Sequence, residues 1–285
     1  MQAEHSLREG RLQDALSELQ AQVRKEPANA KYRIFLFQLL AVLGQWERAL
    51  NQLKVLEEMD PASLSMVQTY REAIQCESLR TEVFAGRRVP LIFGDPEPWM
   101  ALLLEALRLT AEGHYSEAQA AREQAFEGAA AISGTLDEQP FTWLADADPR
   151  LGPMLEAVIN GRYYWIPLQR IRTLTLEPPS DLRDAVWMPA HFTLANGGET
   201  VGLIPSRYPG SPASTDPLVQ LGRKTEWLEP DAGLYLGIGQ RTLATDQNEY
   251  PLLDIRRIDL DVPEITASAT TDSDPSDPSD PSDHG

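Results

Sequence analysis

Few residues in this chain have the types and spacing that chemistry requires. Asp146 and Asp148 could offer two carboxylates to a divalent cation, but Asp148-Pro149 also fits a turn and cap before a helix predicted from Arg150, which is the favoured interpretation. The sequence contains no Gly-x-Ser-x-Gly elbow and no Walker phosphate loop. The four histidines form neither an i, i+4 pair nor a zinc-binding spacing: His5, His114, His191 and His284. We therefore predict no catalytic residue, no cofactor and no metal site.

Two further features could suggest nucleotide binding or a reactive thiol, but their sequence context disfavours both. Gly237-Ile238-Gly239 is half of a dinucleotide-binding fingerprint, but it lies before a predicted strand instead of opening a helix. Cys76 is the single cysteine, and its apolar helical surroundings favour a buried, unreactive thiol. An enzyme whose catalytic residues are brought together only by the fold remains an alternative for the C-terminal half.

The charge balance narrows the class of partner. The formal net charge is −18, and residues 261–285 contribute seven acidic residues and no basic ones. The rest of the chain is still acidic, at about −11, which disfavours nucleic acid because phosphate binding needs a basic surface. No Lys/Arg run suits an anionic membrane, and no stretch approaches the ~20 apolar residues of a membrane span. No signal peptide is visible, and the single cysteine fits a reducing compartment.

The N-terminal part contains a repeat. Gly10 and Gly44 lie 34 residues apart in matching surroundings, and a proline follows each at the same distance, Pro27 and Pro61. This period and pattern are typical of tetratricopeptide helix pairs, in which glycine ends the first helix and proline ends the second. Such repeats stack into surfaces that hold a peptide or helix of another protein.

A third copy begins at Gly113, 69 residues after Gly44, so a divergent repeat is expected between them, around residues 62–85. Residues 34–43 and 99–110 are predicted to form strongly apolar helices. Asp95 is the expected N-cap of the second of these, with Pro96 at its first position.

The character of the sequence changes near residue 131, where prolines, glycines and β-branched or aromatic runs begin. We predict an α+β fold, with tetratricopeptide-like helices over residues 1–130 and an α+β domain with a mostly antiparallel sheet over residues 131–262. Residues 263–285, with their repeated Asp-Pro-Ser, are expected to be a disordered acidic tail.

Within the second domain the expected elements include one helix and several strands. Residues 150–160 are predicted to be a helix that ends at Gly161, and Asn196-Gly197 is predicted to be a hairpin turn with positive φ at both residues. The expected strands are residues 141–145, 162–167, 172–176, 191–194 and 199–204, with a final hairpin formed by residues 240–245 and 252–260.

The partner surface is predicted to lie where the helical part meets the C-terminal domain. The most apolar candidates there are Trp99 and Phe37 on helices, and Tyr163 and Trp165 on an aromatic strand. The alternative is that Tyr163, Tyr164 and Trp165 simply fill the core on alternate faces of a strand. We take Trp99, Trp165, Tyr163 and Phe37 as the candidate partner-binding residues.

Several motifs, taken in order, resemble one family. They are Phe35–Leu40, Asp146–Asp148 with Arg150–Pro153, Gly161–Pro167, Trp187–Ala190, Lys224–Trp227 and Gly237–Arg241. Together they are similar to the ImpE/SciE/TagJ family of type VI secretion accessory proteins, over roughly residues 1–260 and without the acidic tail.

The resemblance implies a cytoplasmic, non-enzymatic adaptor encoded with a contractile secretion machine. It implies binding to the N-terminal helix of the small sheath subunit TssB, and a link to ClpV, the AAA+ ATPase that recycles contracted sheaths, either directly or through the sheath. A generic tetratricopeptide co-chaperone that grips a C-terminal carboxylate is a further alternative. Only Lys31 and Arg33 on the helix from residue 31 to 43 would serve that role, which counts against it.

Overall fold

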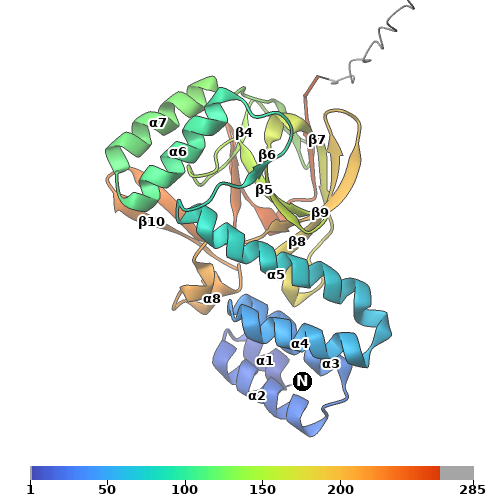
Figure 1. Cartoon of the computed structure of the whole chain (residues 1–285). Helices are drawn as coiled ribbons and strands as arrows, with labels where there is room; N and C mark the ends of the chain where they lie inside the picture. The colour runs from blue at the N-terminus through green and yellow to red at the C-terminus, as the bar shows by residue number, and fades with distance from the viewer. Residues whose placement is uncertain (1, 264–285) are drawn as a thin grey trace, which may run out of the picture.

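The computed structural model describes residues 2–263, so the predicted acidic tail lies almost entirely outside the described residues. Figure 1 shows four helices stacked at one end of the molecule, a long fifth helix between them and the sheet, and a further helical pair beside the sheet. The helices are α1 (Gln2–Arg8), α2 (Leu12–Lys25), α3 (Ala30–Val42), α4 (Trp46–Met59), α5 (Leu64–Phe84), α6 (Pro98–Glu112), α7 (Tyr115–Gly128) and the short α8 (Pro217–Gln220).

The repeat pattern is confirmed in the first two helix pairs. Gly10 and Gly44 connect α1 to α2 and α3 to α4 with φ values of 75° and 65°, a backbone region that favours glycine. Gly113 likewise connects α6 to α7 with φ of 81°. Helix α3 is buried along most of its length, as a helix that is apolar around its circumference must be. None of the described helices combines the length and apolar character that a membrane span requires.

Two helix predictions are wrong. Residues 62–85 form a short 3₁₀ turn followed by the single helix α5, and not the helix pair of a divergent repeat. Helix α6 begins at Pro98, with Glu97 rather than Asp95 as its N-cap. Pro98 occupies the first helical position, where proline costs no hydrogen bond, and Pro96 stays in the loop.

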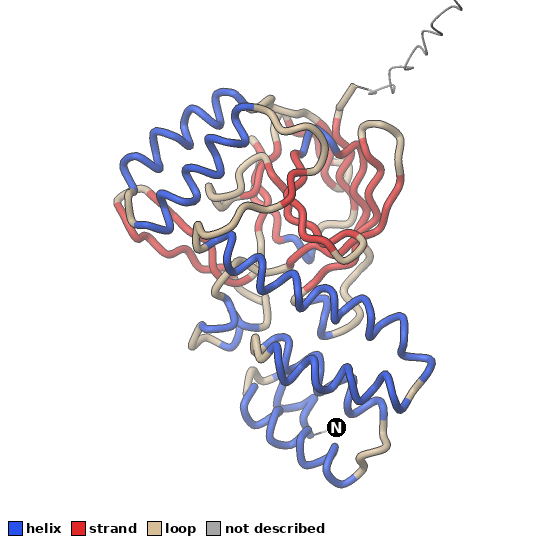
Figure 2. Tube along the Cα trace, in the orientation of Figure 1, coloured by secondary structure: helices blue, strands red, loops and turns tan. Residues whose placement is uncertain are grey.

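The strands, red in Figure 2, form three sheets. The largest sheet has nine strands in the order β1-β6-β5-β9-β8-β7-β14-β2-β3. Its strands are β1 (Leu91–Ile92), β2 (Gly134–Leu136), β3 (Gln139–Phe141), β5 (Met154–Ile159), β6 (Arg162–Pro167), β7 (Ile171–Leu176), β8 (Trp187–Leu194), β9 (Glu199–Pro205) and β14 (Arg257–Leu260). The smaller sheets are β13 (Glu249–Pro251), β12 (Thr242–Thr245) and β4 (Leu144–Asp146), and the hairpin of β10 (Thr225–Asp231) with β11 (Leu234–Gly239). Among the described residues every strand pair is antiparallel except β1 with β6, which confirms a mostly antiparallel sheet.

The predicted helix over residues 150–160 is wrong, because residues 154–159 are β5, an interior strand of the large sheet. All six of its residues are buried, so the sequence has none of the polar–apolar alternation that marks a half-exposed strand. Asn160 and Gly161, with φ of 49° and 70°, turn the chain into β6. The pair of positive φ values expected at Asn196-Gly197 therefore occurs here; the β8–β9 hairpin exists, but only Gly197 of its turn has positive φ.

Two strand predictions also need correction. Residues 141–145 are divided between β3 and β4, and the Thr142 N–H donates to Asp246 at the break. Residues 240–245 and 252–260 do not pair with each other: β12 pairs with β13 and β4, whereas β14 pairs with β2 and β7. In both cases the limits and pairing of the strands depend on hydrogen bonds to strands that are distant in the sequence, which a local pattern does not reveal.

The helices and one face of the large sheet share a single core. One cluster of buried side chains includes Phe37 and Val83 from helices together with Trp165 and Trp187 from strands, and a second cluster fills the other face. The core is therefore continuous between the helices and the sheet, although the secondary structure changes near residue 130. The division into separate domains stays a prediction.

Candidate partner-binding site at the junction of helices and sheet

A ladder of aromatic rings joins the helical repeats to the sheet. Phe37 of α3 lies 5.6 Å from Tyr70 of α5, Tyr70 lies 5.7 Å from Trp187 of β8, and Trp187 lies 5.8 Å from Trp46 of α4, between ring centroids. The Arg183 guanidinium sits over Tyr70, 4.8 Å from its centroid. Tilted rings at these separations attract each other beyond their burial alone, so three helices are held against one strand.

The segment from Ser206 to Arg223 runs along the turns of the helical repeats. A Cβ added at Gly44 would lie 2.7 Å from Cβ of Pro212, and one added at Gly10 would lie 3.4 Å from Cγ of Pro217. The two repeat glycines thus contact two prolines of the same C-terminal segment. Glycine is needed at position 44 for this close approach as well as for its positive φ.

Arg207 reinforces that contact at the end of α3. Its guanidinium donates to the carbonyls of Val42 at 2.8 Å and Ala41 at 3.4 Å, and also to the carbonyl of Gln220. These carbonyls lie at helix C-termini, where a cation is favoured. Burial lowers the pKa of Arg207 to about 10, and the side chain remains charged at neutral pH.

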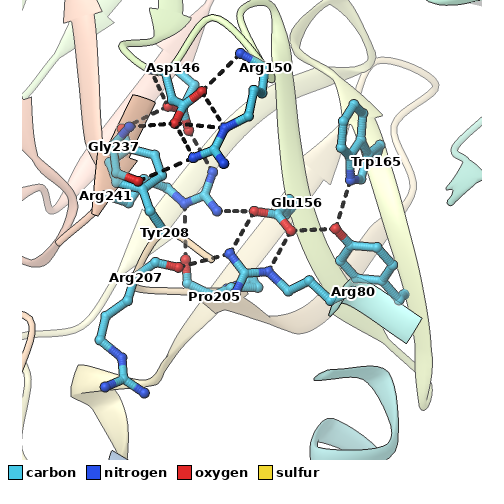
Figure 3. A network of polar contacts seen from close by, with 12 residues as sticks. Arg80, Asp146, Arg150, Glu156, Trp165, Pro205, Arg207, Tyr208, Gly237 and Arg241 are labelled. Carbon is cyan, nitrogen blue, oxygen red and sulfur yellow. Dashed lines mark hydrogen bonds and ion pairs between the residues drawn. The ribbon is translucent and has the colours of Figure 1, made fainter. Parts of the chain in front are cut away.

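Behind this segment lies a network of buried charges (Figure 3). The Arg80 Nε and Nη2 atoms of α5 donate to the two carboxylate oxygens of Glu156 on β5, at 2.7 and 3.0 Å. The Arg241 guanidinium donates to both Glu156 and Asp146, and the Tyr208 hydroxyl donates to Asp146 at 2.8 Å. The side chains of Glu156, Asp146 and Arg241 have no exposed surface.

The two buried carboxylates respond differently to this environment. Burial raises the pKa of Asp146 to about 6, although Arg241 opposes the rise. Burial would also raise the pKa of Glu156, but the guanidiniums of Arg80 and Arg241 outweigh it and lower this pKa to about 2. Glu156 is paired with the guanidiniums of both Arg80 and Arg241, whereas Asp146 is paired only with Arg241. This difference in the number of paired cations accounts for the opposite pKa shifts.

The carboxylate pair considered for a metal has protein partners. Asp148 accepts from the Arg150 guanidinium and, at 2.7 Å, from the Gly237 N–H, while Asp146 pairs with Arg241. Within residues 2–263 no group of three or more metal-ligating side chains is found. Gly237 has a packing role, since a Cβ there would lie 2.4 Å from the Tyr208 ring.

A cavity of about 460 Å³ lies between α5 and the Ser206–Arg223 segment. Aromatic side chains and guanidiniums line it, among them Trp46, Phe84, Arg80 and Arg207. Its guanidiniums are occupied by the carboxylates and carbonyls described above. The carboxylates of Asp146 and Glu156 do not line the cavity, so this arrangement fits a structural clamp better than a general acid–base pair.

The four residues predicted to bind a partner lie in the interior. Trp99 is 4% exposed, Tyr163 1%, and Trp165 and Phe37 0%. The Trp165 indole donates to the Tyr163 hydroxyl at 2.7 Å, and that hydroxyl donates to Glu156. The alternative interpretation of the aromatic strand as core therefore describes this structure. Partner binding by these residues is untested, and a partner would have to open the core to reach them.

A groove on the other side of α5 is accessible. It has a volume of about 610 Å³ and runs between the N-terminal half of α5, the end of β5 and the middle of β8 and β9. Met66, Tyr70, Val158, Val201 and Leu203 give it an apolar lining. Val201 is 60% exposed, which is unusual for a large apolar side chain in a groove. We call this the α5 groove.

Polar groups stand among the apolar ones in the α5 groove. Glu72, Arg183 and His191 are part of its lining. Neither the network nor this groove was predicted from the sequence as such. One available signal was Glu156, a lone carboxylate within the otherwise apolar run Met154–Ile159.

Comparison with known proteins agrees with this architecture. The ImpE protein family matches residues 138–259, and a tetratricopeptide repeat family matches residues 6–74. The type VI secretion system accessory component TagJ of Pseudomonas aeruginosa is 59% identical over 261 residues, which cover 92% of each chain. The crystal structure of protein VPA1032 from Vibrio parahaemolyticus superposes with a TM-score of 0.83 at 25% identity, covering 91% of this chain and 97% of that one. Because 59% identity extends over 92% of both chains and the ImpE family matches residues 138–259, the chain belongs to the ImpE/SciE/TagJ family of type VI secretion accessory proteins.

Proposed function

We propose that this protein is a cytoplasmic, non-enzymatic adaptor of a type VI secretion system. In this proposal it binds the N-terminal helix of the small sheath subunit TssB and so assists the handling of the sheath by the ClpV ATPase. The TagJ relative carries the accessory role in its name, and the helical repeats favour a protein partner. The structural observation that carries the proposal is the α5 groove, in which the exposed Val201 lies beside further apolar side chains.

The groove suits an amphipathic helix in shape and chemistry. Helix α5 has 21 residues, and the part beside the groove gives a partner helix a parallel ridge to pack against. A partner helix would place apolar side chains at i, i+3, i+4 and i+7 against Val201, Leu203 and Met66.

Charge favours a partner helix with basic residues at its edges. The chain carries a net charge of −18, and Glu72 lies in the groove lining. Lysine or arginine beside the apolar face of the partner would be attracted during approach, and the attraction would set the orientation more than the final affinity.

The test is isothermal titration of this protein with a synthetic peptide of the TssB N-terminal helix. We expect saturable binding, absent for a scrambled peptide of equal composition. Val201→Asp should weaken binding roughly tenfold or more, because it puts a charge in the apolar contact, with little change in folding. Val89→Asp is the matched control, since Val89 is 70% exposed and does not line the groove.

Absence of binding by the wild-type protein would refute the helix-binding proposal. Equal affinity of the Val201→Asp and Val89→Asp variants would place the binding site outside the α5 groove.

A further inference from the structure

Arg122, in the middle of α7, is a buried cation without a counter-ion. The residue is only 8% exposed, and its Nη2 donates to the Thr110 hydroxyl of α6 at 3.1 Å. Its Nε is buried and has no acceptor, and no carboxylate of residues 2–263 lies within ion-pair distance of the guanidinium. A buried guanidinium with one hydrogen bond is costly unless an anion compensates it.

The other buried arginines in the described chain show how unusual this is. Arg80 and Arg241 are each paired with carboxylates, and Arg207 donates to three carbonyls. Burial lowers the pKa of Arg122; the charges of Asp148 and Glu123 oppose this only from beyond ion-pair distance, and the charge of Arg150 adds to it. The position therefore has an unmet demand for negative charge.

Arg122 also lines a pocket. A cavity of about 250 Å³ lies between α7 and the turn that joins β10 to β11. Tyr115, Phe126 and Leu234 provide its apolar walls, and Arg122 is the only cation that lines it among the described residues. The Nη1 atom of Arg122 makes no hydrogen bond and, unlike Nε, is not sealed from solvent.

We propose that this pocket binds the side-chain carboxylate of a glutamate or aspartate from a partner protein, with Arg122 as its anchor. The carboxylate would accept from the edge of the guanidinium that Thr110 leaves free, as charge-assisted Arg–carboxylate pairs do. The volume accommodates one side chain. Its apolar walls suit the methylene groups that carry the acid.

The surroundings select this ligand from other anions. Glu123 and Asp231 also line the pocket, and they would repel a phosphate dianion more strongly than a single carboxylate. Large apolar side chains near the pocket are exposed: Phe126 is 39% exposed, and on the hairpin Tyr235 is 50% and Leu228 53% exposed. Such side chains are typical of a surface that contacts another protein.

The first experiment compares two blocked amino acids on the wild-type chain. N-acetylglutamate N-methylamide and its glutamine counterpart are titrated while the Arg122 Nε–H signal is followed by ¹⁵N–¹H NMR. We expect a saturable shift with the glutamate compound and roughly tenfold or weaker binding of the glutamine compound. Equal responses to the two, or no saturable response to glutamate, would refute the proposal.

Two further probes identify the source of the anion. Inorganic phosphate and N-acetylalanine, which has a main-chain carboxylate, are titrated in the same way. Weaker binding of both supports a side-chain acid. Equal or tighter binding of either one would overturn that assignment.

The variants Arg122→Met and Arg108→Met complete the test. Arg108 belongs to an exposed ion pair on α6 and is the matched control. The glutamate response should disappear in Arg122→Met, followed through neighbouring backbone amides, and persist in Arg108→Met. Its persistence in Arg122→Met would refute the proposal. If Arg122→Met does not fold, the glutamate–glutamine comparison on the wild type still decides the question.

One intramolecular alternative needs its own control. Asp231 or Glu123 could close onto Arg122 in solution. In that case Asp231→Asn or Glu123→Gln would shift the Arg122 Nε–H signal without any ligand, and this outcome would overturn the proposal. The proposed helix binding uses the α5 groove and is tested with a different ligand and different variants, so the two can fail independently.

Discussion

Arg80 and Glu156 form a doubly hydrogen-bonded ion pair between the longest helix and a central strand of the nine-stranded sheet. The Nε–Oε1 distance is 2.7 Å, the Arg80 side chain is 7% exposed and the Glu156 side chain 0%. Their separation of 76 residues makes this pair a link between the helical half and the sheet half of the chain. Such a link favours a single relative orientation of helices and sheet.

The first prediction concerns the removal of the Glu156 charge. Glu156→Gln should lower the free energy of unfolding by about 3–5 kcal/mol, because it leaves the buried guanidiniums of Arg80 and Arg241 without their shared anion. Urea unfolding measures this. Glu57→Gln, at the exposed pair with Arg71, is the control and should have almost no effect. Equal effects of both substitutions would contradict the prediction.

The second prediction is a dependence of stability on pH. The pKa of Glu156 falls from its ordinary 4.5 to about 2 in the folded state, so its stabilisation is present above pH 4.5 and is lost between about pH 4.5 and 2. The pKa of Asp146 rises from 3.8 to about 6, so its destabilising ionisation is relieved as the pH falls through 6.

We therefore expect the unfolding free energies of the wild type and of Glu156→Gln to converge as the pH falls from 4.5 to 2. Urea unfolding at a series of pH values measures the difference between the two proteins. A difference that stays constant over this range would show that the folded state does not lower the pKa of Glu156 below 4.5.

The third prediction separates two reasons for glycine. Gly113 and Gly44 both have positive φ, but nothing lies within 4 Å of a Cβ added at Gly113, whereas Pro212 lies 2.7 Å from one added at Gly44. Gly113→Ala should cost about 1 kcal/mol of stability, from backbone strain alone. Gly44→Ala should cost clearly more, since it also pushes the Pro212 segment away.

Replacing Pro212 by glycine in the Gly44→Ala background should restore the stability lost to the clash between the added Cβ and Pro212. Only the loss due to backbone strain should then remain. Thermal or urea unfolding of the single and double variants measures the coupling. Additive losses would mean that the contact between Gly44 and Pro212 carries no energy.

The sequence predicted the elements whose signals are local. The repeat glycines Gly10 and Gly44 mark helix ends through their own φ angles, and strand β6 was predicted with its observed limits, Arg162–Pro167. Strand β5 was missed because its residues are buried on both faces, which removes the alternation that periodicity detects. The turn Asn160-Gly161 was the local signal that could have corrected this.

The junction could not be predicted in the same way. Arg241 pairs with Asp146 and Glu156 across 95 and 85 residues, and no spacing rule connects charges that far apart. The aromatic residues were found by their composition, but composition does not distinguish a buried ring from an exposed one. Trp165 and Val201 illustrate this: the aromatic residue is 0% exposed, and the smaller aliphatic one 60%.

The last prediction compares these two positions directly. Trp165 is enclosed, with Phe84 5.8 Å away between ring centroids and a hydrogen bond to Tyr163. Trp165→Ala should therefore cost about 3–5 kcal/mol of stability through the cavity it leaves. Its folded fraction should bind the TssB helix peptide with unchanged affinity. Val201→Asp should show the opposite combination, with folding kept and affinity lost.

Thermal unfolding and peptide titration of the two variants measure both quantities, and the two form a crossed design in which each controls the other. Trp99→Ala is expected to behave like Trp165→Ala, since Trp99 is 4% exposed. A Trp165→Ala variant that melts like the wild type but fails to bind would show that the indole is reached by the partner, and that the helices and sheet separate at this junction when the partner binds. In that case the Arg80–Glu156 pair would have to open as well, and Glu156→Gln would strengthen peptide binding instead of leaving it unchanged.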